Sequence, residues 1–480
     1  MGSVQCRGIA LCLLWIAGAC AGAPRPQSGV LSIEDVSVID ALHGLREHQR
    51  VVIAGDAIVS IGEARGSAPA GARRIAGAGR YLIPGLWDMH VHLTFTPELT
   101  GAMPGLFLAH GVTSVRDTGG PLDQLVALRE AYEASDAPAP RLYFSGPLLD
   151  GRFVVYDGGD PGRPPIGTRV ASPEVAAERV AQLKAAGADF IKIYEMVDPA
   201  VFDALVAAAK QHALPVAAHV PLALGARGAA PWLDSLEHLR NLDIACAGNA
   251  DELLAERREM LASYRGERGY PLRKRIHRAQ RLPAIAAYDA ATCGRVIAAL
   301  ATTVQVPTLR LNAFPIWRPF ERSDWPEALA RLPAGVLRDR WAEDAARRRA
   351  APHADPTFAR WSMGLVGMLH ASGVPIGAGT DTPITLAIPG YSLHSELELL
   401  VRSGLSPLQA LEAATLVPAR FLGLDDELGA IEPGRRADLV LLAANPLDDI
   451  RNSRAIEGVV SRGRWWSAAE LARQRAPVVH

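Results

Sequence analysis

The sequence has few lysines, few cysteines and no surplus of charge of either sign. Its 50 basic and 51 acidic residues nearly balance, which leaves a formal net charge of −1 over 480 residues. This balance gives no electrostatic basis for binding nucleic acid or an anionic membrane. The apolar runs are too short to predict a transmembrane span. The composition is ordinary for a globular protein, and it leaves open whether the protein is a homo-oligomer.

Cysteine is scarce and unevenly placed. Of five cysteines, Cys6, Cys12 and Cys20 lie near the start of the chain, which leaves Cys246 and Cys293 for the rest. Two cysteines in so large a protein do not form a disulfide scaffold. They could pair after export, but two buried thiols are the favoured interpretation.

Residues 1–23 have the pattern of a signal peptide. Arg7 supplies a positive charge, residues 9–16 are apolar, and small residues follow as far as Ala23. We therefore expect an exported protein, either periplasmic or secreted. Cys20 after Ala-Gly-Ala offers the alternative of a lipid anchor, without the leucine that usually precedes such a cysteine by three residues.

Short apolar runs alternate with helical segments over residues 84–424. The runs predict strands at 82–93, 112–120, 141–146, 190–194, 215–220, 235–239, 302–309 and 375–382. Segments such as 172–188 and 199–213 have the spacing of amphipathic helices. Eight strands alternating with helices predict an α/β fold, a (β/α)8 TIM barrel.

The two ends of the chain have a different pattern. Residues 24–83 and 425–480 alternate apolar and polar positions between glycine-rich breaks, which is typical of antiparallel strands and hairpins. We expect both ends to form one small β-sandwich domain beside the barrel. Two long segments, 249–290 and 314–360, interrupt the barrel pattern and predict helical hairpins. Long loops on this face of a barrel usually shape substrate access.

Six side chains that can bind metal follow the predicted strands. In a barrel, the C-terminal ends of the strands converge on one mouth, where the active site sits. Two histidines separated by one residue on a strand point to the same side and can hold one ion. A carboxylate beside them can bind the same ion and accept a proton from water. The six residues are His90, His92, Lys192, His219, His238 and Asp381.

Lys192 is conspicuous because only four of the 50 basic residues are lysines. Burial in an apolar strand lowers the pKa of an ammonium group and leaves a nucleophilic amine. Such an amine can take up carbon dioxide to form a carbamate, whose two oxygens can bridge two cations. The alternative is an ordinary ion pair between Lys192 and a carboxylate such as Glu195.

Several of these segments together resemble the amidohydrolase superfamily, in its binuclear branch with a carboxylated lysine. They are residues 82–92 (LIPGLWDMHVH), 111–117 (GVTSVRD), 390–397 (GYSLHSEL) and 434–440 (GRRADLV), with the ordered set of six ligand types. The resemblance implies two divalent ions, Zn²⁺ being the expected metal. His90, His92 and Asp381 would hold one ion. His219 and His238 would hold the other, and carboxylated Lys192 would bridge them.

The resemblance also implies an activity on a small-molecule substrate. It is strongest to the imidazolonepropionase-like and Xaa-Pro dipeptidase-like groups, whose members cleave amide C–N bonds in dipeptides or N-acyl amino acids. A hydroxide between the ions would attack the amide carbonyl, and Asp381 would act as the general base. The alternatives are hydrolysis of a cyclic amide, a lactone or a phosphotriester, a mononuclear site, and a barrel scaffold without activity. A sugar isomerase or lyase is disfavoured because the glycine-rich phosphate-binding loops of such barrels are missing.

The sequence departs from the peptidases at two positions. They often have a tyrosine after the strand-5 histidine, where this chain has Val220, and a Gly-Gly-His segment, which residues 154–160 replace with VVYDGGD. Tyr156 or Tyr194 could supply the missing hydrogen-bond donor. His394 or Arg116 could bind a substrate carboxylate or orient a metal ligand from behind.

Overall fold

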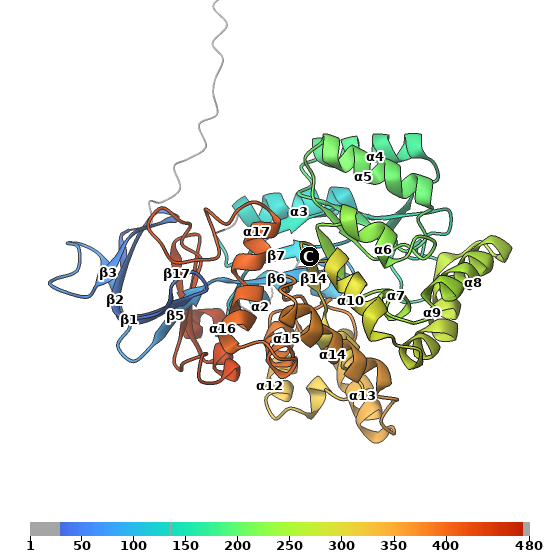
Figure 1. The fold of residues 1–480 in the computed structure, drawn as a ribbon. Helices are drawn as coiled ribbons and strands as arrows, with labels where there is room; N and C mark the ends of the chain where they lie inside the picture. Colours follow the sequence, from blue (N-terminus) through green and yellow to red (C-terminus); the bar gives the residue numbers. More distant parts are fainter. Residues whose placement is uncertain (1–28, 135, 474–480) are drawn as a thin grey trace, which may run out of the picture.

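Strands from both ends of the chain form one sheet in the computed structural model, which describes residues 29–134 and 136–473. The eight strands have the order β17-β16-β15-β5-β1-β2-β3, and β4 pairs with β1. They are β1 (Leu31–Asp40), β2 (Gly44–Ala54), β3 (Ala57–Glu63), β4 (Arg73–Ala76), β5 (Tyr81–Pro84), β15 (Leu439–Leu442), β16 (Ile456–Ser461) and β17 (Arg464–Ser467). Blue and red ribbon meet there in Figure 1. The ends thus share a sheet as expected, while the β-sandwich remains a prediction.

The alternating apolar residues of the two ends pack on each other. Ile33 and Val38 of β1 are buried in one cluster with Val51 of β2, and Leu439 and Leu441 of β15 belong to the same cluster. Alternate residues of a strand point to one face, so the alternation read in the sequence becomes a shared apolar layer. The predicted signal peptide and Cys20 lie outside the described residues.

The middle of the chain forms two parallel sheets, which confirms the α/β class. One has the order β6-β7-β8 and the other the order β10-β9-β11-β12-β13-β14. The strands are β6 (Leu86–Val91), β7 (Val112–Asp117), β8 (Arg141–Phe144), β9 (Leu148–Asp150), β10 (Gly167–Arg169), β11 (Ile191–Ile193), β12 (Val216–Ala218), β13 (Ser235–Glu237) and β14 (Val304–Val306). Seven of the eight predicted strands therefore form. The first of them is divided in two: β5 lies between β15 and β1 in the eight-stranded sheet, and β6 begins the first parallel sheet.

The eighth predicted strand, at 375–382, was wrong as a continuous strand. The segment makes only isolated parallel bridges, from Ile376 to Gln305 and from Thr382 to Val91. Two glycines and the left-handed backbone of Asp381 (φ 61°) interrupt the regular pairing. These bridges nevertheless link the second parallel sheet to the first. On the other side, the Asp189 N–H donates to the Phe144 carbonyl at 2.9 Å.

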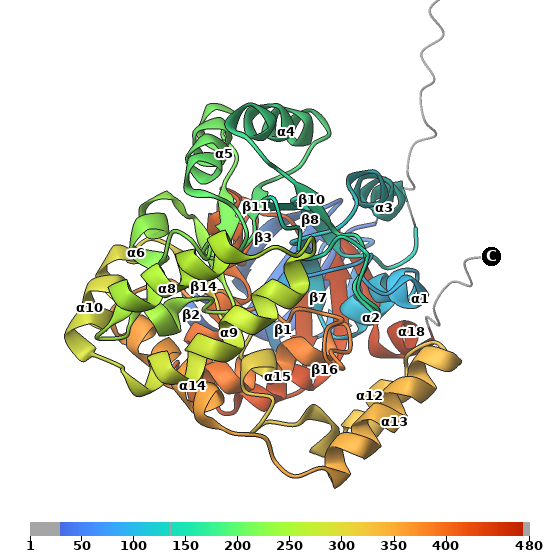
Figure 2. The same cartoon turned by 90° about the vertical axis from the view of Figure 1, so that its right-hand side faces the viewer.

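Helices surround the parallel strands, as Figure 2 shows. They are α1 (Pro97–Thr100), α2 (Met103–Ala109), α3 (Leu122–Ala134), α4 (Pro173–Ala185), α5 (Pro199–Gln211), α6 (Ala226–Ala229), α7 (Leu242–Ala245), α10 (Ala290–Ala299), α11 (Leu309–Asn312), α14 (Thr357–Ala371), α15 (Tyr391–Arg402), α16 (Pro407–Ala413), α17 (Leu416–Phe421) and α18 (Ala468–Arg473). The predicted helix at 172–188 forms as α4. Ser172 caps it by accepting a hydrogen bond from the Val175 N–H. Among the described residues, no helix combines the length and apolar character needed to cross a membrane.

The two predicted insertions are helical. Residues 249–290 form α8 (Ala250–Ser263) and α9 (Gly269–Ala286), here called the α8–α9 hairpin, which projects away from the eight-stranded sheet in Figure 1. Residues 314–360 include α12 (Trp325–Ala330) and α13 (Val336–Ala350). A disulfide joins Cys246 to Cys293 across the base of the α8–α9 hairpin, with Cα atoms 4.1 Å apart. The interpretation of these cysteines as buried thiols was wrong, because the hairpin brings its two ends together.

Candidate metal centre

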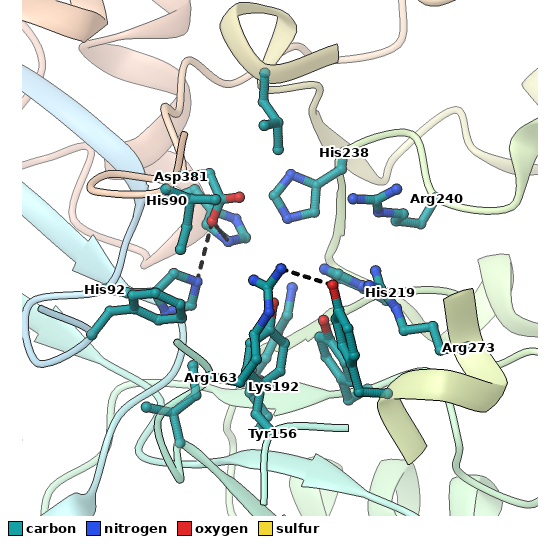
Figure 3. A pocket seen from close by; sticks show the side chains of 17 residues that line it. His90, His92, Tyr156, Arg163, Lys192, His219, His238, Arg240, Arg273 and Asp381 are labelled. Carbon is teal, nitrogen blue, oxygen red and sulfur yellow. Dashed lines mark hydrogen bonds and ion pairs between the residues drawn. The ribbon is translucent and has the colours of Figure 1, made fainter. Parts of the chain in front are cut away.

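All six predicted metal ligands line one pocket of about 180 Å³. Figure 3 shows their side chains pointing toward a common centre. Tyr156 and Tyr194, predicted as hydrogen-bond donors, line the same pocket. The remaining lining residues are Phe95, Leu148, Arg163, Ile166, Arg240, Tyr270, Arg273, Leu311 and Ile384.

The ends of the parallel strands position these ligands. His90 lies in β6, and Lys192 is the middle residue of β11. His219 follows β12, and His238 follows β13. The backbones of His238 (φ 59°) and Asp381 (φ 61°) are left-handed. Such strain in non-glycine residues is held only by the surrounding structure and is concentrated at functional sites.

Each of the four histidines is anchored through Nδ1 by a group outside the pocket. Nδ1 of His90 bonds Glu237 at 2.6 Å, and Nδ1 of His219 bonds Glu195 at 2.7 Å. Nδ1 of His92 donates to the Gly119 carbonyl at 2.9 Å. This arrangement leaves Nε2 of each ring as the nitrogen that can bind a metal, as in histidine ligands with an outer hydrogen-bond partner.

The anchor of His238 fixes its tautomer as well. Its Nδ1 lies 2.6 Å from the Thr308 hydroxyl, which itself donates to the Pro307 carbonyl at 2.8 Å. The hydroxyl proton is thereby engaged, so Nδ1–H of His238 must donate and Nε2 carries a free lone pair. Burial lowers the pKa of His238 well below its usual value and that of His90 to about 4. Neutral imidazole is the form that binds metal.

Asp381 faces the histidines as a carboxylate. Its Oδ1 lies 3.3 Å from Nε2 of His92 and 3.5 Å from Nε2 of His90. Burial alone would raise the pKa of Asp381, but the hydrogen bond from His92 and the nearby positive charges lower it to about 2. His90, His238 and Asp381 offer ligand atoms within 4.8 Å of one another, which defines a candidate metal site.

Lys192 is fully buried beneath this site. Its Nζ has no hydrogen-bond partner among the described residues and lies 4.0 Å from Oε1 of Glu237. Burial lowers the pKa of Lys192 to about 7, so a large fraction of the amine is neutral near neutral pH. The alternative of an ion pair between Lys192 and a carboxylate fits the structure in kind but with another partner. Glu237 lies at ion-pair distance, whereas Glu195 contacts His219, Arg273 and His277.

The other two predicted contacts lie outside the pocket. Arg116 is buried below it and donates to Oε1 of Glu237 at 2.6 Å, which fits the alternative of orienting a ligand from behind. His394 lies in α15, where it bonds the Ser453 hydroxyl and the His110 carbonyl. The structure does not bring His394 to the pocket, so a contact with substrate there was a wrong expectation.

Sequence reasoning missed several residues that shape the site. Glu237 precedes His238 in the apolar segment SLEHL. A charged residue in an apolar segment was the signal in the sequence, and the structure shows that Glu237 is buried. Glu195 was considered only as a partner for Lys192. Arg163, Arg240 and Arg273 line the pocket, but nothing in the pattern of so arginine-rich a chain singles them out.

The fold and site are those of an α/β protein with a candidate metal centre at the ends of parallel strands. The amidohydrolase family model matches residues 341–466. Adenine deaminase of Ligilactobacillus salivarius is 42% identical over 64 residues, which are 13% of this chain and 11% of that protein. Ochratoxinase of Aspergillus niger is 39% identical over 82 residues, 17% of this chain and 16% of that protein. The chain thus aligns with only a small part of these curated relatives.

The likeness to solved structures extends over most of the chain. A Xaa-Pro dipeptidase with bound methionine has a TM-score of 0.64 at 20% identity, covering 91% of this chain and 100% of that one. Ochratoxinase of Aspergillus niger has a TM-score of 0.61 at 19% identity, covering 94% and 99%. At such identities the likeness shows the shared fold. Together with the family match, it supports assignment of the chain to the amidohydrolase superfamily, as its motifs predicted.

Proposed function

We propose that the protein is a metal-dependent hydrolase that cleaves amide C–N bonds of small substrates such as dipeptides or N-acyl amino acids. One observation carries this proposal. Four buried histidines direct Nε2 into one pocket that also contains Asp381 and the buried Lys192, whose Nζ has no hydrogen-bond partner among the described residues. A buried pocket lined by so many nitrogen and oxygen ligand atoms is suited to hold cations.

The donor set fits two divalent ions. Imidazole nitrogens with carboxylate oxygens suit Zn²⁺. We assign His90, His92 and Asp381 to one ion and His219 and His238 to the other. Lys192 would bridge them as a carbamate. Bound divalent ions supply Lewis acidity and make water nucleophilic at neutral pH.

The carbamate on Lys192 requires only chemistry that the pocket supports. The lone pair of the neutral Nζ attacks the carbon of carbon dioxide, a C–O π bond breaks, and the proton released from Nζ goes to water. The carbamate carries one negative charge, which would offset the positive charge of the ions and arginines at the pocket. A pKa lowered to about 7 makes the neutral amine available for this step.

Asp381 is the proposed general base and acid. Its carboxylate lies within 3.5 Å of both His90 and His92 and is ionised at neutral pH. It would accept the proton of the attacking water and deliver it to the leaving nitrogen, so that the C–N bond breaks to a carboxylic acid and an amine. Tyr156 and Tyr194 would donate hydrogen bonds to the carbonyl oxygen as charge develops on it.

The two parallel sheets are linked on both sides. The links through Asp189, Ile376 and Thr382 are those needed to close the parallel sheets into a (β/α)8 barrel. We propose that this barrel spans residues 84–424 and that residues 24–83 and 425–480 form the β-sandwich. We also retain export by a signal peptide at 1–23, for which the residue pattern remains the support.

Metal content and activity of a Lys192→Ala variant test this function. We expect about two ions per chain in the wild type, fewer in the variant, and loss of hydrolysis on a panel of dipeptides, N-acyl amino acids, lactones and phosphotriesters. Lys184→Ala, an exposed lysine of α4, is the matched control. A single ion per chain and an active Lys192→Ala variant would contradict the bridged pair, and cleavage confined to lactones or phosphotriesters would contradict the amide substrate.

A further inference from the structure

Three arginines line the candidate active-site pocket, and they come from different parts of the chain. Arg163 precedes β10, Arg240 follows β13, and Arg273 lies in α9 of the α8–α9 hairpin. Figure 3 shows all three among the proposed ligand side chains. All three are half-buried. A guanidinium group in such a place keeps its charge and is stabilised by an anionic or hydrogen-bonding partner.

Arg273 has such a partner within the protein. Its Nη2 lies 2.7 Å from Oε1 of Glu195, and its Nε lies 2.9 Å from the same oxygen. The attraction of Glu195 raises the pKa of Arg273 in spite of its burial. Its charge is thus balanced before any substrate enters.

Arg240 has none among the described residues. No carboxylate lies within ion-pair distance of its guanidinium, and its buried Nε has no hydrogen-bond partner. The guanidinium groups of Arg273 and Arg281 add positive charge near Arg240. A guanidinium stays charged at neutral pH. A half-buried cation beside His238, with no anionic partner in the described part of the chain, has lost part of its hydration and points to an anionic ligand that pairs with it.

Arg163 is also without a carboxylate partner in the described part of the chain. Its Nη2 donates to the Tyr270 hydroxyl at 2.8 Å, and its guanidinium stacks over the Tyr270 ring at 4.6 Å. These contacts hold the guanidinium at the pocket without neutralising it. A planar guanidinium fixed in this way is suited to bidentate binding of a carboxylate.

The rest of the pocket offers almost no negative charge. Asp381 is the only carboxylate among the residues that line it, and it is committed to the proposed metal site. A substrate with a single carboxylate would therefore leave one of the two unpaired guanidinium groups without an anion. Two carboxylates would satisfy both.

We propose that the pocket selects substrates with two carboxylates near the scissile amide, such as N-acyl glutamate or aspartate and dipeptides that end in these residues. Arg240 and Arg163 would each hold one carboxylate. This substrate class rests on the proposed amide-hydrolase function. It differs from that function in predicting discrimination by charge between substrates of equal size.

Hydrolysis of matched substrates tests the selectivity. N-acetylglutamate and N-acetylglutamine have nearly the same shape, as do Ala-Glu and Ala-Gln, so the comparison isolates the second charge. We expect kcat/KM to be roughly tenfold to a hundredfold higher for the glutamate compounds, the range of one charge-assisted hydrogen-bonded contact. Arg240→Gln and Arg163→Gln should each reduce that ratio toward one. Arg227→Gln, an exposed arginine paired with Asp251, is the matched control and should leave it unchanged.

Binding of a dicarboxylate separates this proposal from the hydrolase function. Glutarate titrated by calorimetry into the metal-loaded protein should bind the wild type and Arg227→Gln, and bind Arg240→Gln and Arg163→Gln at least about tenfold more weakly. If no amide is cleaved but this pattern of binding holds, the hydrolase function fails and the anion site stands. Equal cleavage of glutamate and glutamine substrates, or glutarate binding unaffected by both variants, would overturn the proposal.

Discussion

Two histidines of the candidate metal centre have the same kind of support, built from different parts of the molecule. His90 is held by Glu237, which is held by Arg116, through contacts of 2.6 Å each. His219 is held by Glu195, which is held by Arg273, through contacts of 2.7 Å each. In both cases a buried glutamate stands between a candidate ligand and an arginine.

The two supports differ in how firmly the fold fixes them. Glu237 and Arg116 belong to β13 and β7, and Arg116 also donates to the Met89 carbonyl and packs over the Phe421 ring. Arg273 belongs to the α8–α9 hairpin, outside the parallel strands. The half of the site around His90 is therefore held by the strands themselves. The half around His219 depends on α9, a peripheral helix that also lines the pocket.

The largest effect should come from Asp381, the proposed general base. Asp381→Asn removes the proposed proton acceptor, so we expect kcat to fall by roughly 10²–10⁴-fold. Steady-state kinetics on the best amide substrate would measure this. Metal content measured in parallel separates loss of the base from loss of an ion, and a variant with unchanged kcat would contradict the role of Asp381.

Glu237→Gln should damage the strand-built half strongly. It weakens the anchor of His90 and leaves the buried charge of Arg116 without its anion. We expect metal affinity to fall roughly 10–100-fold and thermal stability to drop. Competition with a chelator and thermal unfolding would measure the two effects. Glu252→Gln, an exposed glutamate of α8, is the control and should behave as the wild type.

Arg273→Gln should have a smaller effect, because Glu195 keeps its contacts with His219 and His277. Loss of about one net hydrogen bond, ~1 kcal/mol, corresponds to about fivefold in metal affinity. Chelator competition under the conditions used for Glu237→Gln measures it. A loss of metal affinity as large as that of Glu237→Gln would show that the supports of His90 and His219 are equally important.

The smallest effect on activity should come from removing the disulfide. Cys246→Ser with Cys293→Ser leaves every pocket side chain in place but opens a loop of 47 residues. The loop-closure entropy of such a bridge corresponds to about 4 kcal/mol of stability at most. We expect a lower Tm by calorimetry and nearly unchanged kcat at 25 °C. A kcat loss beyond that of Arg273→Gln would mean that the bridge positions the pocket itself.

The sequence was sufficient to propose the candidate metal ligands, because the type of each residue and its place in or just after a strand are local properties. His219 and His238 follow β12 and β13 as expected. It was insufficient to predict which residues hold those ligands in place. Whether Glu195 faces Lys192 or His219 depends on how strands and helices pack, and no spacing along one strand records that.

The same limit applies to Arg163 and Arg273, which reach the pocket from a loop and from α9. Arg163 lies between glycine and proline, and Arg273 begins a short basic run, so nothing local marks either as a residue of the pocket. Only the three-dimensional arrangement distinguishes the arginines that face inward. Backbone irregularity explains the other failure. Left-handed residues such as Asp381 break the ladder that a regular apolar pattern at 375–382 predicted.

The close approach of Cys246 and Cys293 has a consequence for how this pocket can evolve. With Cα atoms 4.1 Å apart, the segment between them leaves the body of the protein and returns at nearly the same point. A segment with adjoining ends can be lengthened, shortened or exchanged while the strands on either side keep their register. Tyr270 and Arg273 of the pocket wall belong to that segment. Related proteins can therefore acquire new substrates by replacing one hairpin, provided that the new hairpin still supplies a partner for Glu195, which holds His219.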